Sequence, residues 1–240
     1  MIEDLAALQR TVDDFLHAAV HDIRGPLGQV RALAVLLARQ HKTSLSADGQ
    51  ELCGLIEAAS KRAVEVVESI HVFAGVLEAP VFGVTDLDAV VDSARFTLQG
   101  VIGENRGVIT RDDLGSVQGD RSKLMLLFEE LFRNALKFRG EAPPRIHCSI
   151  QHTADEYVVL SVTDNGAGID QQDADLVFKP LKRLHGREYE GTGMGLAICR
   201  RIVEMHGGKI WVANGSAENG SQRGGAEFRF TLPNFQTVAT

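Results

Sequence analysis

The sequence lacks a long apolar run and lacks a surplus of basic residues. None of its 240 residues lies in an unbroken apolar stretch of about 18, so no segment is expected to span a membrane. The net charge of −7 argues against a general nucleic-acid binder, which would carry a basic surface. Acidic residues near the start, Glu3, Asp4, Asp13 and Asp14, are not typical of a secretory signal. These absences favour a cytoplasmic protein that does not bind nucleic acid.

Cysteine is also scarce. Cys53, Cys148 and Cys199 lie far apart and show none of the spacings that bind metals. Each falls within an apolar pattern, which predicts buried free thiols and suits a reducing compartment. The whole sequence is 44% hydrophobic and 24% charged, which is the composition of a globular protein. Its length allows one large domain or two small ones.

Apolar residues spaced by three and four predict two long helices in the first third of the chain. One seam runs from Leu5 to Leu37 and predicts a helix over about residues 3–40, and a second runs from Leu52 to Leu77. Residues 41–47 between them are polar and predict a loop. The resulting hairpin would bury its apolar stripe either in a four-helix bundle with a second copy or against the rest of its own chain. We favour the homodimer.

His21 falls off the first seam and is expected to face solvent. Pro26, inside the same helical pattern, lacks a backbone N–H and clashes with the carbonyl of Asp22, so the helix should bend or loosen there. A neutral imidazole is a nucleophile near pH 7, and an adjacent carboxylate can hold its second nitrogen. His21 is therefore a candidate nucleophile, with Asp22 as its partner.

A second domain is predicted from residue 86, after a linker over residues 80–85. The expected elements are helices over 86–99, 120–138 and 196–205 and strands over 108–110, 145–151, 157–163, 209–213 and 224–232. The fold class is therefore α+β, with a helical hairpin over residues 1–79 and an α/β sandwich over residues 86–240.

Two stretches of this second domain allow either a nucleotide site or ordinary structure. The ordinary alternatives are a polar helix face toward water for the first stretch and a simple turn for the second. Glu130 and Asn134 are four residues apart on one helix face, where their oxygen atoms could share a Mg²⁺ ion, and Lys137 lies one turn further on. Asp164 follows a predicted buried strand and precedes Gly166 and Gly168. Those glycines would let a ligand approach the backbone closely.

A third stretch is rich in glycine and opens a helix. Backbone N–H groups at a helix start form a ready site for phosphate. The residues involved are Gly191, Thr192, Gly193, Gly195 and Leu196. The basic, aperiodic segment before them is expected to be mobile and to close over phosphate, with Lys182, Arg183, His185 and Arg187 as its cations.

Five motifs resemble those of a known family. The string HDIRGPL at residues 21–27 resembles the H-box of the dimerisation and phosphotransfer domain of sensor histidine kinases. EELFRNALKF at 129–138, DNGAGI at 164–169, VFKPL at 177–181 and GTGMGL at 191–196 follow in the order found in the Bergerat-type ATP-binding domain. Histidine kinases share that domain with gyrase-type, heat-shock chaperone and mismatch-repair ATPases. The segments around residues 137–146 and 186–212 look closest to kinases that follow phytochrome-type light sensors.

The resemblance implies a two-component histidine kinase core. His21 would be phosphorylated from ATP, with Asp22 orienting it, and the phosphoryl group would pass to an aspartate of a response-regulator receiver domain. Asn134 would hold Mg²⁺, Glu130 would act near the γ-phosphate and Lys137 would contact phosphate. Asp164 would bind the adenine amine, and the glycines would let a lid over about residues 179–192 fold over the nucleotide.

Two departures from the family pattern stand out. Gly25 replaces the usual Thr or Asn of the H-box, which puts a phosphatase activity in doubt, and Leu181 replaces a common second Phe. Two other functions remain: an ATPase that uses hydrolysis for a conformational cycle, and a non-catalytic dimeric scaffold. The H-box argues against the first, and intact Asn134, Asp164 and glycines argue against the second.

Overall fold

A computed structural model describes residues 2–152, 156–184, 191–213 and 225–234; for residues 2–17, 21 and 152 it describes the backbone alone. The chain divides into two compact units, one built on residues 1–78 and the other on most of residues 79–240. Within the described ranges, no helix has the length and apolar character needed to cross a lipid bilayer.

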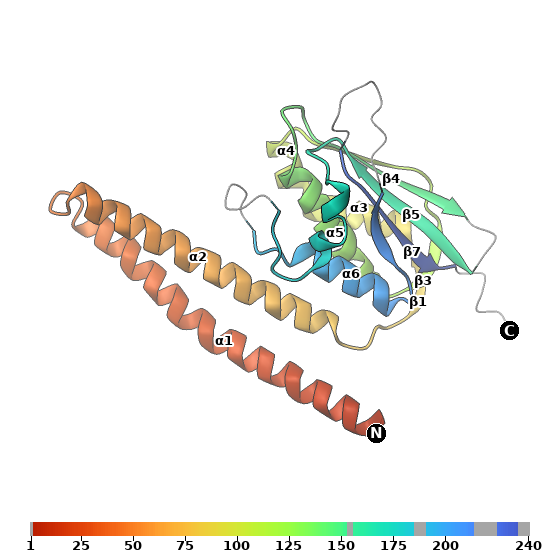
Figure 1. The fold of residues 1–240 in the computed structure, drawn as a ribbon, viewed down its shortest axis with the longest axis horizontal. Helices are drawn as coiled ribbons and strands as arrows, with labels where there is room; N and C mark the ends of the chain where they lie inside the picture. The colour runs from red at the N-terminus through yellow and green to blue at the C-terminus, as the bar shows by residue number, and fades with distance from the viewer. Residues whose placement is uncertain (1, 153–155, 185–190, 214–224, 235–240) are drawn as a thin grey trace. The chain divides into compact units, whose positions relative to one another are not determined.

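The first unit is the expected helical hairpin. Helix α1 spans Ile2–Gln40 and helix α2 spans Ala47–Val76, and the two run side by side (Figure 1). Ser46 begins α2 as its N-cap, because its hydroxyl accepts a hydrogen bond from the backbone N–H of Gly49 at 3.1 Å. Helix α1 continues through Pro26, so the weak point expected there does not end the helix.

The hairpin buries only part of its apolar surface. Small and medium side chains fill the seam between the helices, among them Ala34, Cys53 and Val67, and Arg24 pairs with Glu68 at 2.9 Å. Many large apolar side chains remain more than a third exposed: Ile23, Val30, Leu33, Leu36, Leu37, Leu52, Leu55, Ile56 and Val72. Exposed apolar surface of this extent is typical of an interaction site.

The second unit is built on a five-stranded sheet. Its order is β2 (Val108–Arg111), β4 (Arg145–His152), β5 (Tyr157–Asp164), β7 (Glu227–Pro233) and β6 (Ile210–Ala213). Strands β2 and β4 pair in parallel, and the other neighbours are antiparallel. In β5, Val158, Leu160 and Val162 alternate with more exposed residues, which is the pattern of a sheet with one buried face.

Helices α3 (Leu87–Thr97), α5 (Arg121–Lys137) and α6 (Gly195–Met205) lie together on one side of this sheet (Figure 1). Phe128 of α5 meets Phe230 of β7 edge-on, with ring centroids 5.9 Å apart. Phe178, in the short helix η2 (Leu176–Phe178), meets Phe228 in the same way at 6.3 Å. These aromatic contacts join the helical layer to the sheet, so the expected α+β class is confirmed.

Several short elements were not expected from the sequence. Strand β1 (Gly83–Asp86) pairs with β3 (Ser116–Gly119) in a separate two-stranded sheet, and β1 begins inside the range predicted as linker. The helix predicted over residues 86–99 ends at Thr97 and is followed by α4 (Gln99–Glu104). A short helix, η1, spans Gln171–Asp173. The unexpected elements β1, β3, α4 and η1 have three to six residues each, which is too short to show a clear hydrophobic period.

Candidate functional site

Asp164 is held at the end of β5 by backbone groups. Its Oδ1 accepts hydrogen bonds from the N–H of Gly166 at 2.7 Å and from the N–H of Ala226 at 3.1 Å. Burial disfavours the charged carboxylate and raises the pKa of Asp164, and the two N–H donors offset part of this rise. Among the described residues these bonds use only Oδ1, so Oδ2 is available to a ligand donor.

The turn after Asp164 is fixed to the end of α5. The N–H of Ala167 donates to the carbonyl of Phe138 at 2.9 Å, and a Cβ on Gly166 would lie 2.5 Å from the same oxygen. Gly168 has a φ of +73°, a conformation that side chains disfavour. The glycines predicted at these positions are thus required by backbone geometry, before any ligand is considered.

Asn165 connects this turn to β4. Its side-chain oxygen accepts from the N–H of Arg145 at 2.7 Å, and its amide donates to the carbonyl of Pro143 at 3.1 Å. The sequence predicted no role for Asn165. Its position between an aspartate and a glycine is typical of a side chain that stabilises a turn, and that was the available signal.

Gly225 is a second residue that the sequence analysis missed. A Cβ at this position would lie 1.7 Å from the carbonyl oxygen of Asp164, so only glycine lets the chain enter β7 this close to the end of β5. The next residue, Ala226, supplies the N–H that holds the Asp164 carboxylate. The signal was the pair of glycines directly before the last strand.

Helix α5 carries the other polar site residues. Glu130 is largely buried, and desolvation raises the pKa of its carboxyl group. Asn134 lies one turn further along the helix and is partly exposed. Lys137 places its Nζ over the ring of Phe138, 4.4 Å from the ring centroid. The structure therefore gives Lys137 an aromatic contact next to the turn that follows Asp164.

The start of α6 packs against Glu130. Gly195 is the first residue of α6, and a Cβ there would lie 2.4 Å from Oε2 of Glu130. Two residues predicted from separate motifs are therefore neighbours, and the absence of a side chain at 195 is what makes room for the carboxylate. Leu196 follows in the first turn of the helix.

The glycine-rich stretch before α6 has the backbone of a tight loop. Gly191 and Gly193 have φ values of +132° and +74°, and Thr192 Oγ1 accepts from the N–H of Met194 at 3.4 Å. Residues 185–190 of the predicted lid lie outside the described residues. Before them, Leu181 has a φ of +60° and an exposed side chain, an uncommon combination for leucine.

The candidate nucleophile lies in the hairpin. His21 and Asp22 are both in α1, and the side chain of Asp22 is exposed. The side chain of His21 lies outside the described part of the structure, so its predicted orientation stays a prediction.

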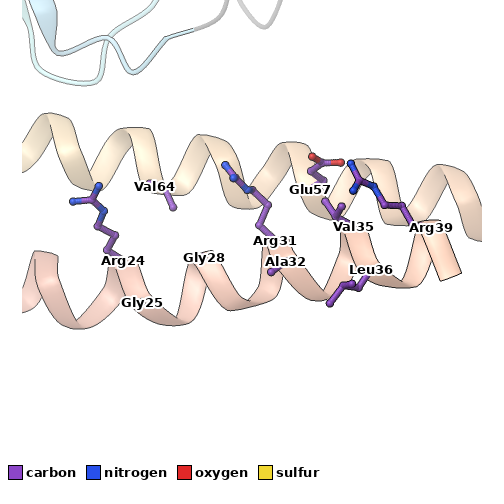
Figure 2. Close-up of a pocket in the computed structure, with 10 residues that line it drawn as sticks. All are labelled: Arg24, Gly25, Gly28, Arg31, Ala32, Val35, Leu36, Arg39, Glu57 and Val64. Atoms are coloured by element: carbon purple, nitrogen blue, oxygen red, sulfur yellow. The ribbon is translucent and has the colours of Figure 1, made fainter.

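A groove follows the hairpin beyond these residues (Figure 2). Gly25 and Gly28 line it, and because a Cβ on either glycine would meet nothing within 4 Å, the space beside them is open. Arg24 is paired with Glu68, whereas Arg31 and Arg39 have no carboxylate partner among the described side chains. The lining residues are Arg24, Gly25, Gly28, Arg31, Ala32, Val35, Leu36, Arg39, Glu57 and Val64.

Comparisons with known proteins agree with this geometry. Residues 119–236 match the family described as histidine kinase-, DNA gyrase B- and HSP90-like ATPase. Cyanobacterial phytochrome A of Nostoc sp. is 37% identical over 97% of this chain and 30% of its own length. The adaptive-response sensory kinase SasA of Prochlorococcus marinus is 31% identical over 96% of this chain and 59% of its own length. The chain thus spans about a third of the phytochrome relative.

Solved structures share the fold along nearly the whole chain. The full-length ShkA structure in complex with AMPPNP has a TM-score of 0.64 and 23% identity, covering 92% of this chain and 45% of its own. The histidine kinase ThkA in complex with the response regulator TrrA has a TM-score of 0.62 and 18% identity, covering 96% of this chain and 65% of its own. At these identities the two structures establish the fold.

Proposed function

Because the chain belongs to the histidine kinases, with the ATP-binding domain of that family, we propose that it phosphorylates its own His21 from ATP and passes the phosphoryl group to a response regulator. The observation that carries the proposal is the convergence of three separate motifs. Asp164 is held between Gly166 and Ala226, the turn after it is fixed to the end of α5, and Gly195 makes room for Glu130 on the same helix.

In the proposed ATP site, Asp164 accepts a hydrogen bond from the adenine amine through its remaining oxygen. A buried carboxylate that lacks a cation partner gains from such a donor, because each charge-assisted bond contributes about 1.5–3 kcal/mol. Gly166 and Gly168 keep the approach free of side chains. Gly191, Thr192, Gly193 and Leu196 lead into α6, whose N-terminal N–H groups favour phosphate.

The residues of α5 fit a Mg²⁺ ion. Asn134 offers an amide oxygen and Glu130 a carboxylate one turn away, both hard ligands of the kind that Mg²⁺ uses together with phosphate oxygens. When bound, Mg²⁺ would offset charge on the phosphates as the γ-phosphoryl group leaves. Lys137, at the end of the same helix, adds a cation for phosphate. Burial of Glu130 raises its pKa, which suits a group that handles a proton near the γ-phosphate.

The transfer step needs a neutral His21. One imidazole nitrogen attacks the γ-phosphorus, a nitrogen–phosphorus bond forms, and the bond from phosphorus to the bridging oxygen of ADP breaks. The other nitrogen carries the proton, and the carboxylate of Asp22 holds that N–H and accepts the proton as the imidazolium forms. Catalysis then consists mainly of positioning the nucleotide and His21.

The exposed apolar side chains of the hairpin support a homodimer in which two hairpins form a four-helix bundle. The groove in Figure 2 supports docking of the receiver domain beside Gly28 and Arg31, where small residues leave room for a helix of the partner. Three buried free thiols suit a protein of the cytoplasm, where thiols stay reduced.

Incubation with ATP labelled on the γ-phosphate tests the proposal. The wild-type chain should acquire label that is lost in acid, as expected of phosphohistidine, and His21→Ala should acquire none. His41→Ala, in the turn after α1, is the matched control and should be labelled like the wild type. Label that survives acid, or that persists in His21→Ala, would contradict the proposal. ATP hydrolysis without any label would instead favour a simple ATPase, and ATP binding without turnover would favour a scaffold.

A further inference from the structure

The segment that enters the ATP-binding unit is attached through a backbone hydrogen bond. The side chain of Val81 is 81% exposed and contributes little to packing. Its N–H, however, donates to Oδ2 of Asp120 at 2.8 Å. This bond is the first described attachment of the chain to the unit, two residues before β1 begins at Gly83.

Asp120 performs two tasks with its two carboxylate oxygens. Oδ1 accepts from the N–H groups of Ser122 and Lys123 at 3.0 and 3.1 Å and so caps the first turn of α5. Oδ2 holds Val81. An N-cap needs only the first of these interactions, and serine or threonine would supply it equally well. The longer aspartate side chain is needed for the second.

His206 fixes the backbone of Asp120. Its Nε2 accepts the N–H of Asp120 at 2.9 Å, and its Nδ1 donates to the carbonyl of Ile202 at 2.7 Å. The side chain is 2% exposed, and the ring of Phe82 meets it edge-on with centroids 5.2 Å apart. Val81 is therefore held by Asp120, and Phe82 by His206. Asp120 is the N-cap of α5 and His206 directly follows α6, so the linker is held where the ends of these two helices meet.

The same two helices carry the proposed site at their other ends. Helix α5 begins at the Asp120 cap and continues to Glu130 and Asn134. Helix α6 begins at Gly195, against Glu130, and leads to His206. The point where the linker attaches is thus joined to the nucleotide site by two packed helices.

We propose that Asp120 and His206 are positioning residues that form a latch for the interdomain linker and fix the point from which the ATP-binding unit swings toward His21. The inference rests on the proposed kinase function. Without the latch, the first fixed point would move to β1, where Thr85 Oγ1 donates to the carbonyl of Gly119 at 2.8 Å. Residues 81 and 82 would then join the free linker, because β1 begins at Gly83, and at about 3.5 Å per extended residue they would add roughly 7 Å of reach.

The substitution Asp120→Ser separates the two tasks of the aspartate. Serine keeps the N-cap of α5 but is too short to hold Val81. Asp86→Ser is the matched control, because Asp86 caps α3 through the N–H groups of Asp88 and Ala89 and does not hold the linker. Asp120→Asn is a second variant that retains one acceptor oxygen for the cap and turns an amide group toward the Val81 N–H.

Amide hydrogen exchange at Val81 measures the hydrogen bond to Asp120 directly. We expect Val81 to be protected in the wild type and in Asp86→Ser, and to lose at least about tenfold of that protection in Asp120→Ser while Leu124 in α5 stays protected. Autophosphorylation should fall at least about fivefold with the KM for ATP unchanged, because orientation is lost and binding is not.

Unchanged protection at Val81 in both Asp120 variants would overturn the latch. A loss of protection with an unchanged autophosphorylation rate would overturn its positioning role, and so would a loss of rate explained entirely by a higher KM for ATP. If the wild type takes no label at all, the proposed kinase function fails, whereas the exchange result at Val81 still decides whether the latch exists.

Discussion

At the scale of single residues, the candidate site depends on glycines, because a side chain at these positions would collide with its neighbours. A Cβ on Gly195 would lie 2.4 Å from Oε2 of Glu130, and one on Gly166 would lie 2.5 Å from the carbonyl of Phe138. The first contact is with the end of a flexible side chain and the second is with fixed backbone. A substitution at Gly195 would therefore displace the carboxylate of Glu130, whereas one at Gly166 would disturb the turn after Asp164.

Gly195→Ala should impair catalysis more than stability. The added methyl group displaces the carboxylate of Glu130, which can move at a cost of about 1 kcal/mol or less. A misplaced group near the γ-phosphate, however, costs on the order of 10²-fold in rate. Autophosphorylation and thermal unfolding, measured on the same preparation, check this. Gly100→Ala in α4, where a Cβ would meet nothing within 4 Å, should leave the rate unchanged. Equal rates for Gly195→Ala and the wild type would contradict the prediction.

Asp164→Asn should stabilise the nucleotide-free protein and weaken ATP binding by about 10- to 100-fold, since a charge-assisted hydrogen bond is lost. Burial raises the pKa of Asp164 above its ordinary value of 3.8, so its contribution to stability is fully present below that pH and is lost as pH rises through the folded-state pKa. The stability gain of the variant should therefore grow as the pH rises from 3.8 through the folded-state pKa and stay constant above that pKa. Unfolding at a series of pH values and calorimetric titration with ATP measure the two effects.

The matched control for Asp164→Asn is Glu104→Gln at the end of α4, where the side chain is exposed. It should change neither stability nor ATP affinity by a measurable amount. A variant at Asp164 that binds ATP as tightly as the wild type would remove the proposed adenine contact.

At the scale of elements, the sequence predicted the long helices and strands well and the short ones poorly. The helices over 120–138 and 196–205 and the strand hairpin over 145–163 appear within one or two residues of their expected bounds. Each has at least seven residues with a clear apolar period. Strands β1 and β3 have four residues each, and Val84 and Val117 alone cannot show a period of two.

The same limit applies to the candidate site. Asp164, Gly166 and Glu130 were predicted as site residues because their motifs carry their own signal. Gly225 and the carbonyl of Phe138 act through the backbone of a distant segment, and no local pattern records that β7 enters beside the end of β5. Such close approaches follow from tertiary packing, which a single sequence does not display.

Gly225→Ala should disrupt the pairing of β5 and β7 at the site. The Cβ would lie 1.7 Å from the carbonyl oxygen of Asp164, a backbone atom at the end of β5 that cannot move without disturbing the strand. We therefore expect a loss of about 3 kcal/mol in unfolding free energy and a loss of ATP binding. Chemical denaturation measures the loss. Gly83→Ala at the start of β1, where a Cβ has open space, should cost no more than about 0.5 kcal/mol. Similar stabilities for the two variants would show that the strands can separate at no cost.

At the scale of the whole molecule, the proposed homodimer depends on the exposed apolar surface of the hairpin. Introducing a charge into an apolar interface costs several kcal/mol unless the charge finds a partner. We therefore expect the wild type to be a dimer and the double variant Val30→Glu with Leu37→Glu to be a monomer. Sedimentation equilibrium distinguishes the two states.

Gln29→Glu introduces a charge at a neighbouring exposed position of α1 and serves as the control, which should remain a dimer. If the hairpin instead buries its apolar stripe against its own chain, all three proteins should be monomers with the same mass in solution. A monomeric wild type would therefore contradict the four-helix bundle.

Helix α5 is anchored at both ends, and this restricts insertions and deletions within it. Asp120 holds its first turn to the linker, and the carbonyl of Phe138 at its far end holds the turn after Asp164. One inserted or deleted residue would rotate everything beyond it by about 100° and shift it by about 1.5 Å, so only one anchor could survive. The segment between Asp120 and Phe138 should therefore tolerate substitution on its surface but no change in length, whereas the turn between α1 and α2 can absorb insertions. A library of single-residue insertions and deletions, selected for autophosphorylation, should contain no active variants with a change of length in this interval.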